Sequence, residues 1–247
     1  MVSLREAVSF LTILPLGDLA ARFDPEIGMS RALAWFPLVG AAIGGLAGAA
    51  AFSLVSWLSD GAATLIALLT LAILTGGLHL DGFADTVDGL GARVGREQTL
   101  EVMRDSRIGT FGAAGLFFLL GLKWALLQLI PTDRWIPALA TVCAAGRWSL
   151  VISAQFFHYI PGRQGIGRLA TDRRAPESVV AATAIGLVLS LVGMGRLEGL
   201  MLLPVAGGVA WILNAWFVRR LGGITGDTLG AVNEAVEVAA LLFLVRG

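Results

Sequence analysis

The sequence predicts an all-α fold, a polytopic transmembrane helix bundle of about seven spans. Two observations carry this prediction. Of the 247 residues, 56% are hydrophobic and only 15% are charged, whereas about 25% of residues are charged in an ordinary soluble domain. The apolar residues also form long uninterrupted runs without the period-2 alternation of a membrane β-barrel. We therefore expect an integral membrane protein built from helices.

The individual spans follow from the positions of the apolar runs. A run of about 18 or more apolar residues is long enough to cross a bilayer as a helix. The last run contains Glu234 and Glu237, and a six-span alternative omits it but leaves a mostly apolar C-terminal stretch unexplained. The predicted spans cover residues 33–58, 61–78, 110–130, 136–157, 178–195, 199–218 and 228–245.

The distribution of basic residues predicts the orientation of the bundle. With seven alternating spans, most of the 18 arginines and lysines fall on one side, and arginine and lysine concentrate in cytoplasmic loops. The N-terminus should therefore be cytoplasmic and the C-terminus outside. The long polar segments 79–109, 158–177 and 219–227 fall on the cytoplasmic side and are too short for a separate soluble domain, so residues 1–247 form one membrane domain. The net charge of zero offers nucleic acid no general basic field.

Three aspartates at helical spacing are the first candidate site. Asp81, Asp85 and Asp88 should project within roughly 60° of each other, directly beyond the second predicted span, and His79 should project roughly opposite them in a structural role. No lysine or arginine balances these acids within the helix. Oxygen ligands of this kind suit Mg²⁺, which is usually held by a few carboxylates together with substrate phosphate. The alternative interpretation is a solvated acidic face.

A second polar set occurs near the C-terminus. Asp227, Asn233, Glu234 and Glu237 should share a sector of roughly 120° on one helix. Charged residues inside membrane spans usually face the bundle interior and have a function. The alternative is a packing interaction with Arg147, the arginine that lies inside a predicted span.

Basic residues flank the acidic motifs. Arg104 and Arg107 surround Asp105 just before the third span, and Arg163 and Arg168 lie in a glycine-rich segment. The glycine spacing alone is a weak phosphate-loop signal, because no strand precedes it and no Lys-Ser/Thr follows. Arginine forks nevertheless match phosphate oxygens. We therefore expect an anionic substrate near the aspartates.

These motifs resemble the cobalamin synthase family, also called adenosylcobinamide-GDP ribazoletransferase. The resemblance spans essentially the whole chain and depends on residues 10–15, 77–89, 103–112 and 222–231. The chain departs from the family at Leu80, where many members have glutamate. Position 80 should therefore be dispensable for metal binding. It implies the last step of the coenzyme B12 nucleotide loop. In that step adenosylcobinamide-GDP and α-ribazole, or α-ribazole phosphate, give adenosylcobalamin, or its phosphate, and GMP with Mg²⁺. It also implies a location in the bacterial cytoplasmic (inner) membrane, surrounded by lipid, with the active site facing the cytoplasm. Whether the protein forms homo-oligomers stays open.

The residues and the resemblance together suggest roles for the motif side chains. Two alternatives stay open. One is a membrane CDP-alcohol phosphotransferase, although the aspartate spacing of that family differs. The other is an ion-coupled transporter, but the acids cluster at one membrane face and the sequence contains no evident repeated half, and both features argue against it. We expect Asp81, Asp85 and Asp88 to bind the metal, Asp88 or Asp105 to accept the proton from the attacking hydroxyl, and Arg104, Arg107, Arg147, Arg163, Arg168, Asp227, Asn233, Glu234 and Glu237 to bind substrate.

Overall fold

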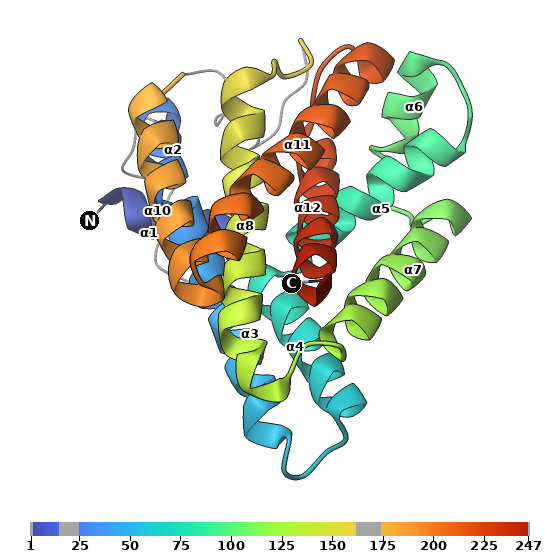
Figure 1. Cartoon of the computed structure of the whole chain (residues 1–247). Helices are drawn as coiled ribbons and strands as arrows, with labels where there is room; N and C mark the ends of the chain where they lie inside the picture. The colour runs from blue at the N-terminus through green and yellow to red at the C-terminus, as the bar shows by residue number, and fades with distance from the viewer. Residues whose placement is uncertain (1, 15–24, 162–173, 247) are drawn as a thin grey trace.

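The protein is a bundle of helices in the computed structural model, which describes residues 2–14, 25–161 and 174–246 (Figure 1). Those residues contain no β-strand, only an isolated bridge between Tyr159 and Ile224. The helices are α1 (Val2–Leu11), α2 (Pro25–Ala32), η1 (Leu33–Trp35), α3 (Phe36–Leu54), α4 (Asp60–Thr75), α5 (Leu78–Gly91), α6 (Arg96–Val102), α7 (Thr110–Leu127), η2 (Thr132–Arg134), α8 (Trp135–Phe156), α10 (Pro176–Met194), α11 (Arg196–Leu221) and α12 (Gly226–Arg246).

The helix lengths confirm the predicted multi-pass bundle. Among the described residues, six helices are long and apolar enough to cross a membrane, and the bent pair α4–α5 makes a seventh span if it counts as one. The sixth is α12, so the six-span alternative that omitted the C-terminal run was wrong in that respect. The six helical spans are Met29–Leu54, Thr110–Leu127, Thr132–Phe156, Pro176–Met194, Arg196–Leu221 and Gly226–Arg246.

Helix α8 lies at the centre of the bundle (Figure 1), and 83% of its apolar stretch is buried. Its closest neighbour is α3, which presents Gly40, Gly44 and Gly48 to it. A Cβ added to Gly48 would lie 2.7 Å from Cα of Ile136, too close for real atoms. Small residues let helix backbones approach closely in membrane proteins. The glycines therefore explain why α3 can pack directly on the central helix.

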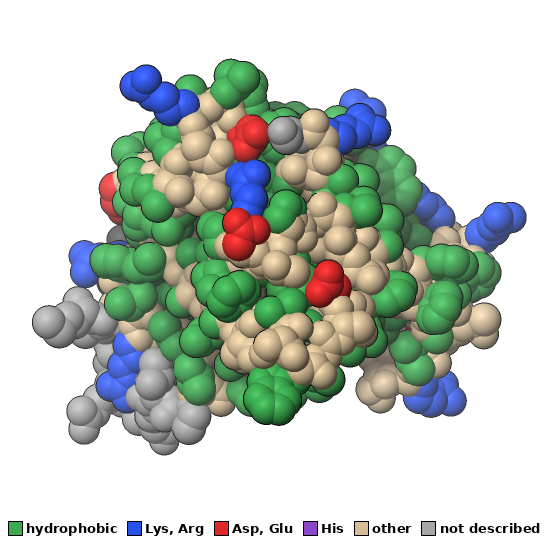
Figure 2. All heavy atoms as spheres, turned by 60° about the horizontal axis from the view of Figure 1, so that its bottom comes forward, with side chains coloured by type: hydrophobic (Ala, Val, Ile, Leu, Met, Phe, Trp, Pro, Cys, Tyr) green, Lys and Arg blue, Asp and Glu red, His purple; other side chains and the backbone are tan. Residues whose placement is uncertain are grey.

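The outer surface of the bundle is apolar. Phe117, Phe118, Val192 and Ile212 are each at least 70% exposed. Figure 2 shows hydrophobic side chains spread over the face turned forward, interspersed with backbone and other uncharged side chains and with few charged ones. Exposed apolar residues on this scale would be a liability in water, but they suit lipid. The surface is therefore that of a membrane protein.

Helices α4 and α5 are separated by a sharp break. The aspartates were expected to continue the second span, but α5 turns by 92° from α4. Gly76 and Gly77 have φ angles of +59° and +70°, a left-handed conformation that glycine adopts without a Cβ penalty and that often ends helices. The backbone amide of Ile13 donates to the carbonyl of Leu74 (3.0 Å), satisfying an end group of α4. The break directs α5 against α12 and α7.

The described parts of the long polar segments that lie beyond α5 meet at one end of the bundle. Figure 1 shows α6 and the ends of α8 and α11 at this end, opposite the α3–α4 connection. Arg220 donates to the carbonyl of Val94 (2.8 Å), and the amide of Ile160 donates to Ile224 (3.1 Å). These contacts agree with the prediction that the segments share one side of the membrane. That this side, with the N-terminus, is cytoplasmic stays a prediction.

Candidate active site

Asp81 and Asp85 lie on one face of α5 and line a pocket of about 670 Å³. Asp81 is exposed and Asp85 is half-buried. Among the described residues neither carboxylate has an ion-pair partner, and Asp81, Asp88 and Asp227 lie close enough to Asp85 for their charges to act on it. Four acids thus gather here, and no basic side chain among the described residues pairs with Asp81 or Asp85.

The rest of this pocket is mostly apolar. Phe10 and Ile13 come from the N-terminal segment, and Ile108 and Ser106 come from the connection before α7. The hydrogen bond from Ile13 to the end of α4 holds the N-terminal segment beside the helix break. The pocket therefore offers two carboxylates on one wall and apolar surface around them. A ligand that is partly anionic, with a cation, and partly apolar fits this combination.

Asp88 has a different environment although it shares the helix. It is buried, and its two carboxylate oxygens accept hydrogen bonds from the backbone amides of Gly109 (2.8 Å) and Gly112 (2.7 Å). These amides open α7, whose first N–H groups lack partners inside the helix. A carboxylate there also interacts favourably with the helix dipole. Asp88 thus joins α5 to the start of α7, and its predicted metal-binding and catalytic roles stay predictions.

The oxygen ligands fit a shared Mg²⁺ site better than a complete protein cage. No group of three or more His, Cys, Asp or Glu side chains within the described residues is arranged to hold a metal ion. Mg²⁺, however, usually takes only one or two carboxylates, with waters and substrate phosphates completing its shell. Asp81 and Asp85 provide two such carboxylates on the pocket wall. Magnesium binding at this place stays a prediction that the ligand chemistry permits.

The predicted anion-binding residues separate in space. Arg104 is exposed and lines a second pocket of about 800 Å³ together with Arg96. Arg107 instead forms an ion pair with Asp105 (Nη2 to Oδ2, 2.6 Å). Hydrogen bonds from the Arg107 side chain and backbone lower the pKa of Asp105 to about 2. A carboxylate with so low a pKa is a poor general base near neutral pH. Arg163 and Arg168 lie outside the described residues.

The late polar set splits into two parts. Asp227 lies beside α5, because a Cβ added to Gly82 would come within 3.0 Å of the Asp227 backbone. Asn233, Glu234 and Glu237 are instead buried inside the bundle. A packing interaction of these acids with Arg147 was one of two interpretations of the sequence. The structure shows that contact: Nη1 of Arg147 donates to Oε1 of Glu237.

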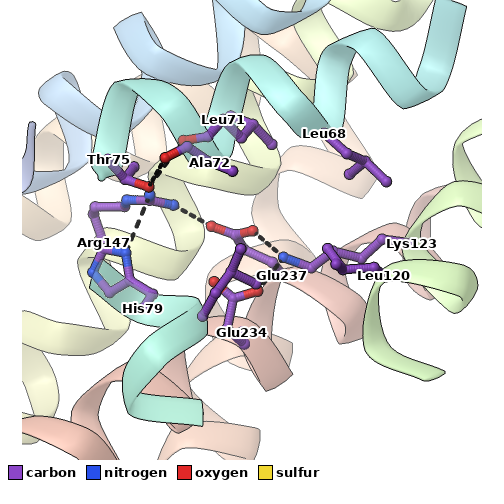
Figure 3. A pocket seen from close by; sticks show the side chains of 11 residues that line it. Leu68, Leu71, Ala72, Thr75, His79, Leu120, Lys123, Arg147, Glu234 and Glu237 are labelled. Atoms are coloured by element: carbon purple, nitrogen blue, oxygen red, sulfur yellow. Dashed lines mark hydrogen bonds and ion pairs between the residues drawn. The ribbon is translucent and has the colours of Figure 1, made fainter. Parts of the chain in front are cut away.

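A lysine that sequence reasoning did not connect with these acids completes the group. Nζ of Lys123, on α7, lies 2.5 Å from Oε2 of both Glu234 and Glu237. Nδ2 of Asn233 also donates to both glutamates, at 3.2 and 3.1 Å. Figure 3 shows Lys123 and Arg147 approaching Glu237 from opposite sides. The one available signal was the presence of a lysine inside an otherwise apolar span. We call Lys123, Arg147, Glu234 and Glu237 the buried ion cluster.

The fold and these sites define a multi-pass α-helical membrane protein. Its candidate active site is an acidic face on the second helix of a broken pair. The comparisons with known proteins give the particular family: the model of the cobalamin-5-phosphate synthase family matches residues 3–245. The chain belongs to this family.

Similar curated proteins agree over nearly the whole chain. A Bradyrhizobium diazoefficiens protein named adenosylcobinamide-GDP ribazoletransferase is 42% identical over 98% of this chain and 92% of its own length. Proteins of the same name from Klebsiella pneumoniae strain 342 and Roseiflexus sp. strain RS-1 are 38% and 37% identical over 97% of this chain, which corresponds to 96% and 87% of their lengths. No solved structure matches the chain.

Proposed function

We propose that this protein joins adenosylcobinamide-GDP to α-ribazole, or to α-ribazole phosphate, and releases GMP. A hydroxyl oxygen of the ribazole ribose forms a bond to the phosphorus attached to cobinamide. The bond between that phosphorus and the bridging oxygen breaks, so that the oxygen leaves with GMP, and the hydroxyl proton passes to a base. The products are adenosylcobalamin, or its phosphate, and GMP. Family membership and the names of the relatives support this reaction over a CDP-alcohol phosphotransferase or an ion-coupled transporter.

The observation that carries the proposal is the unbalanced acidic face of α5. Asp81 and Asp85 have no ion-pair partner among the described residues and line a pocket large enough for part of a nucleotide-bearing substrate. A pyrophosphate alone would be repelled by these carboxylates. Bound Mg²⁺ would neutralise phosphate oxygens and stabilise the leaving GMP. Asp81 and Asp85 are the residues that would hold it.

The remaining residues of the site orient the reactants and handle the proton. Asp88 holds the start of α7 against α5 through Gly109 and Gly112. These contacts support a role in aligning the two helices. Because the Arg107 ion pair makes Asp105 a weak base, the hydroxyl proton would pass to an oxygen of Asp81 or Asp85 that does not hold the metal. Arg104, exposed beside the second pocket, is available to bind phosphate oxygens.

We also propose that the polar end of the bundle faces the cytoplasm of a bacterial inner membrane. The contact between Arg220 and Val94 at this end supports this, as do the basic residues of the polar segments there, Arg93, Arg96, Arg104, Arg107, Arg219 and Arg220. Reporter fusions after Gly247 should then report the outer side. Fusions within residues 163–174 should report the cytoplasm. Finding both on one side of the membrane contradicts the seven-span topology.

The reaction is tested with purified protein in detergent. GMP and the cobamide product are separated by chromatography and quantified with adenosylcobinamide-GDP and α-ribazole present together or singly. We expect one GMP per cobamide, dependent on both α-ribazole and Mg²⁺ and abolished by chelation. Parallel assays with α-ribazole phosphate determine the preferred acceptor. Turnover of a CDP-alcohol with a lipid acceptor, without reaction of the corrinoid, contradicts the assignment.

A further inference from the structure

The buried ion cluster is neutral and closed to large ligands. Lys123 and Arg147 supply two positive charges, and Glu234 and Glu237 supply two negative charges. Each of these side chains is at most 5% exposed. The cavity between them has a volume of only about 20 Å³, room for about one water molecule. Neither a nucleotide nor a corrinoid can enter, so contacts between these side chains and substrate are excluded in this arrangement.

The cluster nevertheless lies next to the helix that carries the acidic face. Its members come from α7, α8 and α12, and Nη2 of Arg147 lies 3.4 Å from Nδ1 of His79 near the start of α5. Figure 3 shows the His79 ring directed at the Arg147 guanidinium. Arginine can only donate, so Nδ1 must accept and the ring proton resides on Nε2. His79 is separated from Asp81 by one residue.

The backbone around His79 is also tightly packed against α12. A Cβ on Gly230 would lie 3.0 Å from the carbonyl oxygen of His79 and 3.2 Å from Cα of Gly82. Three residues further along α12, a Cβ on Gly146 of α8 would lie 2.8 Å from Oδ1 of Asn233. Helix α12 therefore packs closely against both α5 and α8. Because the backbones are in direct contact at these glycines, a displacement of the cluster would also displace the first turn of α5.

We propose that the buried ion cluster is an anchor that acts through Arg147 and His79 to position α5, and with it Asp81 and Asp85, without touching the substrate. The expected effect on turnover depends on the proposed function, whereas the expected effect on the position of α5 does not. It gives His79 the role of a positioning residue. It replaces the expectation that Arg147, Asn233, Glu234 and Glu237 bind substrate.

The kinetic test compares substitutions of His79. His79→Leu keeps volume but removes the acceptor, whereas His79→Asn keeps a side-chain oxygen able to accept from Arg147. We expect kcat to fall at least tenfold in His79→Leu, with KM for both substrates changed less than twofold, and we expect His79→Asn to recover most of kcat. The matched control is Ser149→Ala, a buried position on α8 whose hydrogen bond stays within that helix; its kcat should be unchanged.

A structural measurement separates this proposal from the proposed reaction. In a Cys143→Ala background, spin labels at Ala92 and Leu242 report the distance between the end of α5 and α12. We expect a broader or shifted distance distribution in His79→Leu, and a native one in His79→Asn and Ser149→Ala. This result supports the anchor even if no GMP is formed. An unchanged distribution and unchanged kcat in His79→Leu overturn it, as does a raised KM with kcat retained, which would mean that His79 contacts substrate.

Discussion

Two acidic regions of this molecule look alike in sequence and differ completely in their surroundings. The glutamates of α12 each have a lysine, and Glu237 also an arginine, within ion-pair distance, and all four side chains are buried. Asp81 and Asp85 of α5 have no such partner among the described residues, and they line a pocket. Intramembrane charges must be paired or must serve a function. The α12 acids satisfy the first condition, and the α5 acids point to the second.

The difference also separates structural roles from chemical roles. In a closed, neutral cluster the charges are already satisfied by the protein, and an added cation would find no free carboxylate. On the pocket wall the acids repel one another, and a cation arriving with its phosphate ligands relieves that repulsion. Substitutions should therefore affect folding in the first region and turnover in the second. Four predictions test this division, from the largest expected effect to the smallest.

Removing one charge from the buried ion cluster should have the largest effect. Lys123→Met leaves two buried glutamates facing one arginine, and breaking a buried ion pair costs about 3–5 kcal/mol because one charge stays unpaired. We expect little or no folded protein in detergent, measured by fluorescence-detected size exclusion and thermal unfolding.

The double variant Lys123→Met/Glu234→Gln is the matched test of charge balance. It leaves the neutral pair of Arg147 and Glu237, so folded protein should return to at least half of the native yield. If the single variant is as stable as the native protein, the cluster does not anchor the bundle. If the double variant stays unfolded, neutrality alone is not the reason for its stability.

Neutralising the pocket acids should reduce turnover while leaving the fold intact. Asp81→Asn and Asp85→Asn remove candidate Mg²⁺ ligands but break no ion pair among the described residues. We expect kcat/KM to fall on the order of a hundredfold or more, as for loss of a charge-stabilising group. The melting temperature should be equal or higher, because repulsion at Asp85 decreases. Native turnover in both variants would exclude this face from the chemistry.

The helices were predictable because lipid leaves the backbone few choices. A spanning segment must satisfy its own hydrogen bonds, so long apolar runs predicted every span, including α12 with its two glutamates. The bend at Gly76 and Gly77 was not predicted, although both glycines were visible, because a glycine pair fits a straight helix or a break equally well. Tertiary packing of α5 against α12 decides between them.

The division of roles within the site was not predictable from one helix. Asp81, Asp85 and Asp88 do share a face of α5, as their spacing indicated, but the partners of Asp88 are amides of Gly109 and Gly112. Lys123 likewise meets Glu234 across 111 positions of sequence. Spacing along one helix identifies which side chains share a face, and only the packing of other helices determines which of them remain available.

Asp88 is the intermediate case between the two regions. Asp88→Asn keeps the shape of the side chain but directs an NH₂ group at one of two backbone N–H groups. A hydrogen bond to a charged group contributes about 1.5–3 kcal/mol, so we expect the free energy of unfolding to decrease by about that amount. Turnover should also fall, because the α5–α7 junction loosens.

A second substitution tests the same junction from the side of α7. In Gly112→Ala the new Cβ would collide with the Asp88 carboxylate, so it should reproduce both effects without changing any charge. Both variants are measured by thermal unfolding and by GMP release with increasing Mg²⁺. Loss of turnover at native stability in Asp88→Asn would instead support the predicted role of Asp88 in metal binding or catalysis.

Asp105 should show the smallest effect. Its ion pair with Arg107 is exposed at the surface, where such pairs contribute little, and Asp105→Asn should change the melting temperature and kcat only slightly.

Hydrogen bonds from Arg107 lower the pKa of Asp105 to about 2, below the value of about 3.9 for an unfolded chain. The stability from this pair is therefore complete above about pH 4 and is lost as the pH falls through about 2. Native protein and Asp105→Asn should consequently have the same pH–rate profile between about pH 5 and 8, measured as GMP release. A hundredfold loss of kcat in Asp105→Asn, with the acidic limb of the profile removed, would identify Asp105 as the general base and transfer the chemistry from the α5 face to the connection before α7.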